Sequence, residues 1–422
     1  MSQELKKRMM RTTILAAAIM ALAYSSPALA GPSYSYLTTL AITGGTFTGY
    51  DLATFDNTTQ LFYLTDRSNN GIDVYSAKTN AFVERIGSGL FSGATPSNDN
   101  AGPNGISISD VAGGKLLLAG NGASNLLSFN LDTTGLNVVG TPRTISSAVT
   151  GVTPVPPNRV DGVAFSPTAN TILAANNAST PGFVTLIDNA TGAITKTILL
   201  NGTGGYPDVG GNGVEATIFN TKTGTFFVAV PALNAAGTGA GGVIELDAKT
   251  GALLNTFDFN ALGLSGVCSP TGLVQGGGGS MLVACSDGTA GHSVILDPAT
   301  KKLTLVNGIS GGDQVTYDPA TDQFIEAARF QLVNGVVTPQ LGIIDASTLN
   351  LQVLPIGAND HGVAVDAISG KIFVPTAKTN AYPGCTTGCI LVFAQAVPEP
   401  ATWSLMGLAM LGLAFVKRRF SA

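Results

Sequence analysis

A unit of about fifty residues recurs seven times along this chain, and this repetition restricts its possible folds more than any other feature. Each unit has an apolar strand, a turn rich in Thr, Gly and Asn, and a second apolar strand. A third strand then enters Asp-x-x-Thr-Gly or a related turn, and a fourth strand follows. The units lie near residues 49–88, 102–146, 159–202, 212–259, 268–308, 311–356 and 359–395. Such a period predicts units that bury their apolar faces against one another.

The last unit is one strand short, and the missing strand is found at the other end of the chain. Residues 359–395 supply three strands, whereas residues 36–43 have the pattern of a fourth strand with no three before it. Pairing the first and last strands would close a ring and remove its open edges. The sequence therefore predicts an all-β fold over residues 31–396, a seven-bladed β-propeller closed by its N-terminal strand. The 53 glycines and 21 prolines suit its many turns, and no stretch of this body has helical periodicity.

The repeats are similar to those of the YVTN/NHL-type propellers, with Leu-Phe-Tyr-Leu-Thr-Asp at residues 61–66 as a relative of that family's strand. The resemblance spans residues 34–395 and implies the fold. Propellers of this type include binding proteins, lactonases and lyases, so the resemblance leaves the function open. The phrases at residues 311–315 and 361–366 resemble a group of exported propellers of unassigned role that also carry late cysteine pairs.

The first thirty residues have the layout of a secretory signal. Four basic residues occur among the first eleven, an apolar run covers residues 14–23, and a polar stretch ends in Ala28-Leu29-Ala30. Small residues at these last positions are what a signal peptidase recognises. A folded amphipathic helix is the alternative, but the apolar run has no polar face and Pro27 precedes the small-residue site. We predict that residues 1–30 are a signal peptide cleaved near Ala30.

The last twenty-six residues hold a second targeting segment. Pro398-Glu399-Pro400 is followed by an apolar stretch over residues 403–416 and by the basic residues 417–419. This order closely resembles the PEP-CTERM tail, which implies recognition by an exosortase-type membrane protease in a Gram-negative, exopolysaccharide-producing bacterium. The apolar stretch is shorter than the roughly twenty residues of a spanning helix. We therefore expect residues 397–422 to anchor the protein only transiently and to be processed near the Pro-Glu-Pro box, with a plain membrane anchor as the alternative.

The charge of the body excludes one class of partner. The chain has 21 basic and 26 acidic residues; the signal holds four and one of them, and the tail three and one. The remainder is 14 against 24, a net charge of −10. Such a body repels phosphate backbones, so we expect no nucleic-acid partner. An acidic exported protein suits divalent cations and cationic or neutral ligands better.

The four cysteines form two local pairs, Cys268 with Cys285 and Cys385 with Cys389. In an oxidising compartment, an even number of closely spaced cysteines predicts disulfides. The alternative is a metal site, but this needs a tetrahedral set of four ligands. The pairs lie on different repeats, and neither has a histidine at zinc-finger spacing. Two disulfides are therefore predicted.

One polar residue in each repeat falls where the innermost strand begins, at the mouth of the central channel. These residues are Asp51, Asn104, Asp161, Glu215, Thr271, Asp313 and His361. Converging carboxylates repel one another, which favours either a bound cation or raised pKa values. Asp161, Glu215 and Asp313 are candidate ligands for Ca²⁺ or another divalent cation, and a histidine beside them also suits a transition metal. The alternative is a polar, water-filled channel that holds no fixed ion.

The two histidines of the chain suggest a candidate acid–base set. His292 ends a loop on the same face as the ring, so His361, Asp313 and His292 are candidate catalytic residues. A surface or structural role for the histidines is the alternative.

Three functions stay open at this stage. The first is a non-enzymatic propeller of the cell surface or extracellular matrix, delivered by export machinery and an exosortase, that binds a small ligand, a polysaccharide or a cation at its top face. The second is a metal-assisted hydrolase or lyase, lactonase-like, that uses the acidic ring and His361. The third is a pure scaffold.

Overall fold

A computed structural model gives the fold and describes residues 32–155, 158–264 and 267–396. The predicted signal peptide and the predicted sorting segment both lie outside the described residues. Within the described part of the chain, no helix is long and apolar enough to cross a membrane.

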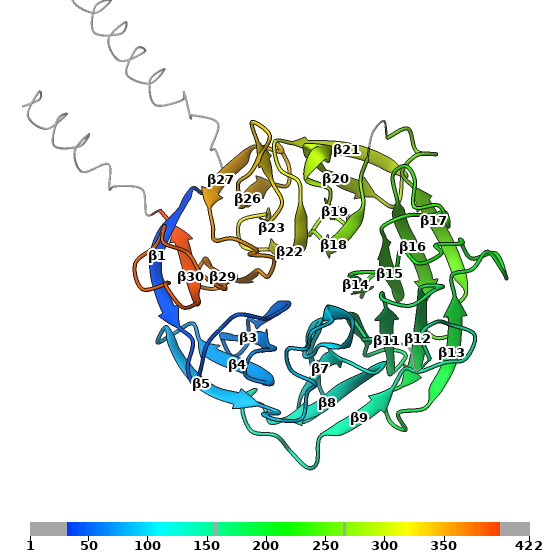
Figure 1. Ribbon diagram of the computed structural model, residues 1–422, viewed down its shortest axis with the longest axis horizontal. Helices are drawn as coiled ribbons and strands as arrows, with labels where there is room; N and C mark the ends of the chain where they lie inside the picture. Colours follow the sequence, from blue (N-terminus) through cyan, green and yellow to red (C-terminus); the bar gives the residue numbers. More distant parts are fainter. Residues whose placement is uncertain (1–31, 156–157, 265–266, 397–422) are drawn as a thin grey trace, which may run out of the picture. The chain divides into compact units, whose positions relative to one another are not determined.

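Residues 34–396 form seven four-stranded antiparallel sheets arranged as the blades of a ring (Figure 1). The seven-bladed propeller expected from the repeats is therefore confirmed. The strands of blades 1 and 2 are β2 (Ala53–Asp56), β3 (Leu61–Asp66), β4 (Gly71–Ser76), β5 (Ala81–Ile86), β6 (Ile106–Val111), β7 (Gly114–Asn121), β8 (Asn125–Leu131) and β9 (Arg143–Ser146). Those of blades 3 and 4 are β10 (Gly162–Ser166), β11 (Thr171–Asn176), β12 (Phe183–Asp188), β13 (Ile194–Leu199), β14 (Thr217–Asn220), β15 (Thr225–Val230), β16 (Gly242–Asp247) and β17 (Leu253–Asp258).

The remaining blades follow the same plan. The strands of blades 5 and 6 are β18 (Pro270–Gln275), β19 (Met281–Cys285), β20 (His292–Asp297), β21 (Lys302–Asn307), β22 (Gly312–Asp318), β23 (Gln323–Ala328), β26 (Gln340–Asp345) and β27 (Leu351–Pro355). Blade 7 has β28 (Ala364–Asp366), β29 (Lys371–Thr376), β30 (Cys389–Gln395) and β1 (Tyr34–Ala41). The loops carry the small hairpin β24 (Leu332–Val333) and β25 (Val336–Val337) and the 3₁₀ turns η1 (Asn98–Asn100) and η2 (Gly288–Ala290).

The ring closes in blade 7, where the first strand of the chain completes the last sheet. β1 pairs antiparallel with β30, from Tyr34 opposite Gln395 to Ala41 opposite Cys389. The prediction that an N-terminal strand completes the last blade is therefore confirmed, although this strand lies two residues earlier than the expected range 36–43. With this closure every blade has four strands, and the edges that an open array of blades would expose are protected.

The core lies between neighbouring blades. Side chains of β3 and β4, such as Tyr63 and Val74, pack with Leu117 and Phe129 of blade 2 in one buried cluster. Because a blade is covered on both faces, all six residues of β15 are buried. In the outermost strand of the same blade, β17, the first four residues alternate between partly buried and exposed positions, which matches its open outer edge, and Phe257 is buried.

The direction of the strands defines two faces. We call the top face the one where each innermost strand begins and where the second strand turns into the third. The turns between third and fourth strands lie on the bottom face, where Asp188 accepts hydrogen bonds from the backbone N–H and the hydroxyl of Thr191. Asp247 and Thr250 repeat this arrangement in blade 4. β1 starts and β30 ends on the bottom face, so both ends of the ring lie opposite the top mouth.

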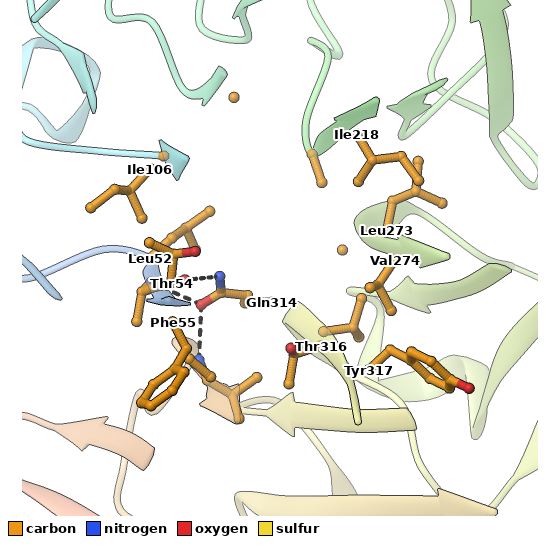
Figure 2. Close-up of a pocket in the computed structure, with 18 of the residues that line it drawn as sticks. Leu52, Thr54, Phe55, Ile106, Ile218, Leu273, Val274, Gln314, Thr316 and Tyr317 are labelled. Atoms are coloured by element: carbon orange, nitrogen blue, oxygen red, sulfur yellow. Dashed lines mark hydrogen bonds between the residues drawn. The ribbon is translucent and has the colours of Figure 1, made fainter. Parts of the chain in front are cut away.

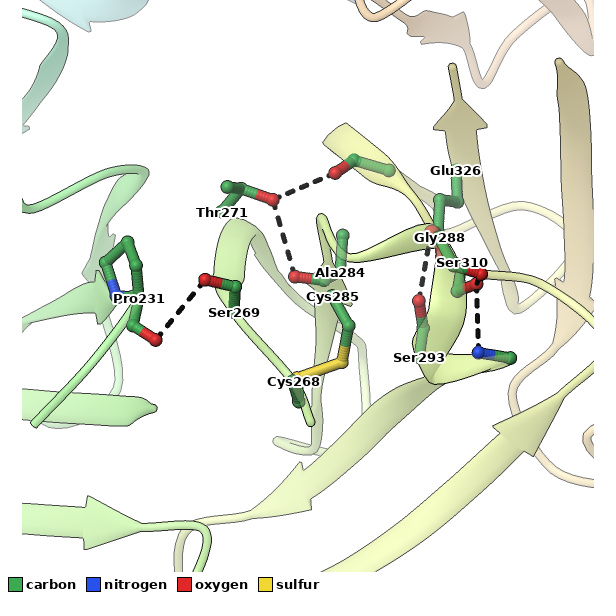
Figure 3. Close-up of a disulfide and its surroundings, with 12 residues drawn as sticks. Pro231, Cys268, Ser269, Thr271, Ala284, Cys285, Gly288, Ser293, Ser310 and Glu326 are labelled. Carbon is green, nitrogen blue, oxygen red and sulfur yellow. Dashed lines mark hydrogen bonds between the residues drawn. A yellow bond between two sulfur atoms is a disulfide. The ribbon is translucent and has the colours of Figure 1, made fainter. Parts of the chain in front are cut away.

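Both predicted disulfides are present. Cys268 bonds to Cys285, and Cys385 bonds to Cys389. The first joins the segment that enters β18 to the end of β19, close to Thr271, the second residue of β18 (Figure 3). It therefore fixes the top end of the innermost strand of blade 5.

Candidate functional site

The structure brings six of the seven predicted ring residues together around one cavity on the top face. The cavity has a volume of about 350 Å³ and is lined by Asp51, Asp161, Glu215, Thr271, Asp313 and His361. Each of them lies within three residues before an innermost strand or is its second residue, because the repeats place equivalent residues at similar heights around the axis. The cavity is the candidate functional site.

Asn104, the seventh ring residue, does not line the cavity. It is completely buried, and its amide donates to the carbonyl oxygens of Ala101 and Val160. Its Oδ1 accepts two hydrogen bonds from the guanidinium of Arg67, at 3.1 and 2.6 Å. Asn104 therefore orients an arginine at the mouth and has no free polar atom to offer a ligand.

Three arginines enter the mouth and were absent from the predicted site. Arg67 lies 2.9 Å from Asp51, Arg159 lies 2.8 Å from Asp161, and Arg329 lies 3.0 Å from Asp313. Three of the four carboxylates of the predicted ring therefore have a guanidinium partner, which was not part of the prediction. The loops that carry the arginines point inward, which the alignment of innermost strands could not show.

A signal for these arginines was present in the sequence. Residues 31–396 contain five arginines, and three of them reach this cavity. Arg67 directly follows β3 and Arg329 directly follows β23, so both hold the position after the second strand of their blades. Comparing that position between repeats would have identified these two, but not Arg159, which lies between β9 and β10.

Asp51 and His361 form one wall of the mouth. His361 Nδ1 donates a hydrogen bond to the carbonyl of Asn359 at 2.6 Å, because a carbonyl can only accept. Its Nε2 consequently faces the cavity, 3.5 Å from Asp51 Oδ1. The imidazole stacks on Tyr50, with ring centroids 4.7 Å apart and planes at 9°. The ring orientation of His361 is therefore fixed from two sides.

Electrostatics keep Asp51 ionised. Burial by itself raises the pKa of this carboxyl, but the charge of Arg67 and the hydrogen bond and charge of His361 outweigh burial and lower the pKa to about 2. At neutral pH Asp51 is therefore ionised and can only accept hydrogen bonds.

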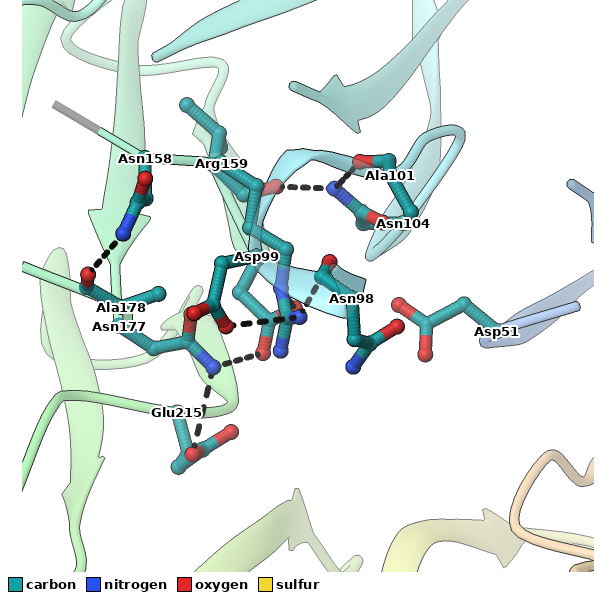
Figure 4. A network of polar contacts seen from close by, with 12 residues as sticks. Asp51, Asn98, Asp99, Ala101, Asn104, Asn158, Arg159, Asn177, Ala178 and Glu215 are labelled. Atoms are coloured by element: carbon teal, nitrogen blue, oxygen red, sulfur yellow. Dashed lines mark hydrogen bonds and ion pairs between the residues drawn. The ribbon is translucent and has the colours of Figure 1, made fainter. Parts of the chain in front are cut away.

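Glu215 and Asp161 form the opposite wall of the mouth. Arg159 pairs with Asp161, and no basic side chain in the described structure pairs with Glu215. The amide of Asn177 donates to Asp161 at 2.9 Å and to Glu215 at 3.4 Å. Figure 4 shows Asn177 pointing toward Glu215. Burial raises the pKa of Glu215 well above its usual value, and repulsion from Asp161 and Asp313 adds to the shift. Burial also raises the pKa of Asp161, although Arg159 opposes it. Glu215 is thus the group of the mouth most able to hold a proton and to donate it.

His292 lies away from the cavity. It is the first residue of β20, is 7% exposed, and its Nε2 has no hydrogen-bond partner within the described structure. Asp313 and His361 line the same cavity, but the structure does not bring His292 to them. The top face is wider than its mouth, so sharing a face does not place two residues in contact.

The structure leaves untested the sequence-based hypothesis of a resident cation at the ring. Among the residues described, no three His, Cys, Asp or Glu side chains are grouped so that they could hold a metal ion. Asp161, Glu215 and Asp313 all line the cavity, but Asp161 and Asp313 are each paired with an arginine.

Comparison with known proteins identifies the end of the chain. Residues 396–419 match the model of the PEP-CTERM protein-sorting motif. The protein is exported to the cell envelope or surface. This motif is an export signal of Gram-negative bacteria that exosortase-type machinery recognises, so the predicted export and the predicted sorting partner are confirmed. A comparison with curated proteins found no match, and the YVTN/NHL subtype stays a resemblance.

Proposed function

We propose that this surface-sorted propeller is a binding protein, not an enzyme, and that its mouth takes a neutral, hydroxyl-rich ligand such as a sugar unit of an extracellular polysaccharide. The supporting observation is the alternation of donors and acceptors around the cavity. Arg67, Arg159 and Arg329 offer N–H donors beside carboxylate acceptors. A sugar hydroxyl both donates and accepts hydrogen bonds, so it needs this mixture.

The charge balance of the mouth favours a neutral ligand. Four carboxyl groups and His361 stand beside three guanidinium groups in one cavity. A strongly charged ligand of either sign would meet groups of its own sign at short range and low dielectric, which is unfavourable. A hydroxylated ligand avoids this repulsion and still uses the charge-assisted hydrogen bonds that both kinds of group provide.

The mouth is also organised before a ligand arrives. Arg67 is held by Asn104 and by the side chain of Asn98, 2.6 Å from its Nη1. Arg159 donates to the backbone carbonyl of Asn98 at 2.8 Å as well as to Asp161. Binding therefore orders few additional side chains, which improves affinity. The chain continues toward its sorting segment from the bottom face, so the mouth stays clear of that segment's attachment point.

Calorimetric titration of the exported protein with neutral monosaccharides and oligosaccharides tests the proposal. Arg329→Met removes one donor and releases Asp313, and we expect an affinity loss of about tenfold or more, which is the usual effect of a lost charge-assisted hydrogen bond. Arg143→Met is the matched control, because Arg143 donates to Asn189 of blade 3 and does not line the mouth. Equal affinity in both variants, or no sugar binding at millimolar concentration, would overturn the proposal.

The geometry of His361 supports a second candidate, a metal-assisted hydrolase or lyase acting on a lactone-like substrate. With Nδ1–H fixed by Asn359, Nε2 faces the cavity beside Asp51, and in the neutral imidazole it can serve as a general base. Turnover of lactones with added divalent cations would be lost in His361→Gln while ligand binding remained. Absence of turnover under every cation tested would exclude this candidate.

A further inference from the structure

The loop that joins β23 to β26 carries an exposed apolar surface beside the mouth. Arg329 begins this loop and lines the mouth. The next residue, Phe330, is 43% exposed, and the hairpin that follows exposes Val333, Val336 and Val337, at 37%, 64% and 54%. We call these four apolar side chains the rim. Apolar side chains that are exposed together, and not singly, indicate a contact surface.

Arg329 connects the rim to the mouth. Its Nη2 lies 3.0 Å from Asp313 Oδ2, and its guanidinium carbon lies 4.7 Å from the centre of the Phe330 ring. One guanidinium thus contacts both a carboxylate of the mouth and the aromatic ring. Because the ring remains 43% exposed beside this guanidinium, the rest of it faces solvent next to the mouth.

Asp313, the partner of Arg329, is held in place by its neighbour in β22. The amide nitrogen of Gln314 donates to the carbonyl of Ala53 at 2.5 Å, and its oxygen accepts from the backbone N–H groups of Ala53 and Val363, at 3.0 and 2.8 Å (Figure 2). These hydrogen bonds join blade 6 to blades 1 and 7 at the residue after Asp313. Asp313 therefore gives Arg329, and the ring that Arg329 contacts, a fixed anchor.

The hairpin of the rim is a defined structure. β24 and β25 pair antiparallel, and Asn334 and Gly335 turn between them with φ angles of 53° and 79°. Two successive positive φ angles are typical of a type I′ turn. Gln331 anchors the base of the hairpin, since its buried side chain accepts a hydrogen bond from the backbone N–H of Ser310 at 2.7 Å. The rim therefore presents its apolar groups in a fixed arrangement.

We propose that the mouth holds one unit of a polysaccharide and that the rim holds the next unit, packed on the ring of Phe330. The proposal rests on the proposed function for the first unit and adds a second subsite. A polysaccharide that continues on both sides of its bound unit must pass over the top face, where the rim lies. A sugar ring has a face of C–H groups, and these pack favourably on the negative face of an aromatic ring.

The size of the rim favours a sugar over a protein partner. A stable protein–protein interface buries about 1,200–2,000 Å² in total. Four side chains of one loop supply only a small part of that area, whereas a single sugar ring is comparable in size to the phenyl ring on which it would pack.

Calorimetric titration of the exported protein with glucose, galactose and mannose, and with their linear disaccharides and tetrasaccharides, tests the second subsite. We expect a disaccharide to bind about twofold to tenfold more tightly than its monosaccharide, the usual gain from contact with an aromatic ring. This gain should be lost in Phe330→Ala and should return in Phe330→Tyr, which keeps the ring. Val353→Ala is the control and should keep the gain, because Val353 is 42% exposed on β27, the outermost strand of the same blade.

A monosaccharide that binds as tightly as its oligosaccharides would overturn the second subsite and leave the mouth as a sugar site. A disaccharide gain that Phe330→Ala does not reduce would do the same. Equal weakening of monosaccharide and disaccharide by Phe330→Ala would show that Phe330 only supports Arg329, which also overturns the subsite. Self-association in sedimentation that Phe330→Ala abolishes would assign the rim to a second copy of the chain instead. No saccharide binding at millimolar concentration would overturn both proposals.

Discussion

The guanidinium of Arg67 lies 2.9 Å from the carboxylate of Asp51, and both side chains are almost completely buried. Asp51 stands just before β2 and Arg67 just after β3, so the pair joins the top ends of two neighbouring strands of blade 1. Asn104 of the next blade holds the same guanidinium from its other edge. One arginine thus links two blades to the wall of the mouth.

Replacing Arg67 by methionine should therefore be strongly destabilising. The change leaves Asp51 buried without its partner, and breaking a buried pair in this way typically costs about 3–5 kcal/mol of unfolding free energy. Urea denaturation followed by circular dichroism measures it. Lys78→Met is the control at an exposed position and should change stability by less than about 0.5 kcal/mol. Similar unfolding midpoints for the two variants would contradict a structural role for the pair.

Glu326 should make stability depend on pH. Burial raises its pKa to about 7, although hydrogen bonds from Ser293 and the backbone of Gly312 oppose the shift. The folded state keeps a proton that the unfolded chain loses, so this contribution is complete below the ordinary pKa of 4.5 and is lost as pH rises through 7. Glu326→Gln should be near neutral at pH 5 and should stabilise the protein by about 1–3 kcal/mol at pH 8.

Urea midpoints measured from pH 5 to pH 8 would show this difference. Ser293→Ala removes the hydroxyl that donates to Glu326 at 3.0 Å and should steepen the loss of stability with pH. Part of the slope should remain in Glu326→Gln, because burial also raises the pKa of Asp360 to about 8. Parallel stability curves for Glu326→Gln and the unmodified protein would show that Glu326 is not the titrating group.

Closure of the ring can be tested within a single strand. In β1, Leu40 is 5% exposed and belongs to a buried cluster with side chains of blades 1 and 7, whereas Leu37 is 48% exposed. Leu40→Ala should cost about 2–5 kcal/mol, the usual range for a truncated core leucine. Leu37→Ala should cost less than about 0.5 kcal/mol. Equal effects on the thermal midpoint would mean that β1 is not packed as described.

The two disulfides should contribute unequally. Cys268 and Cys285 are 17 residues apart, whereas Cys385 and Cys389 are four apart. In the chain-entropy model a disulfide that closes a longer loop stabilises the fold more. Alanine at both cysteines of the first pair should therefore lower the free energy of unfolding by about 3 kcal/mol, and alanine at both cysteines of the second pair by about 2 kcal/mol. Chemical denaturation of the two double variants would test the order. A larger loss from the short loop would point to local packing around Cys385 instead.

Removal of divalent cations by a chelator should leave the melting temperature of the protein unchanged. Arg67, Arg159 and Arg329 already pair with carboxylates of the mouth, so a divalent cation would have to displace a guanidinium. We expect the same melting temperature after treatment with EDTA and after addition of Ca²⁺. A stoichiometric ion found by metal analysis, with a melting temperature that falls by several degrees on chelation, would establish the predicted cation site.

The sequence by itself determined the architecture of this protein. The period of about fifty residues, the three strands at residues 359–395 and the lone strand near residues 36–43 required a closed ring of seven blades. The disulfides followed from the local cysteine pairs, and the sorting tail followed from the order of its three parts. These features depend on residues close together in the chain or on a pattern that repeats, and both can be recognised in the sequence.

Only the tertiary structure decided the chemistry of the mouth. Arg159 and Arg329 reach the ring from loops of different length, Asn104 turns away to hold Arg67, and His292 stays outside the cavity. Nor did the strand pattern show that a second cavity, which shares Leu52 and Asp313 with the first, lies within the ring. Where a side chain of a loop points, and what lies beneath it, depends on how seven blades meet around one axis. No single repeat contains that information.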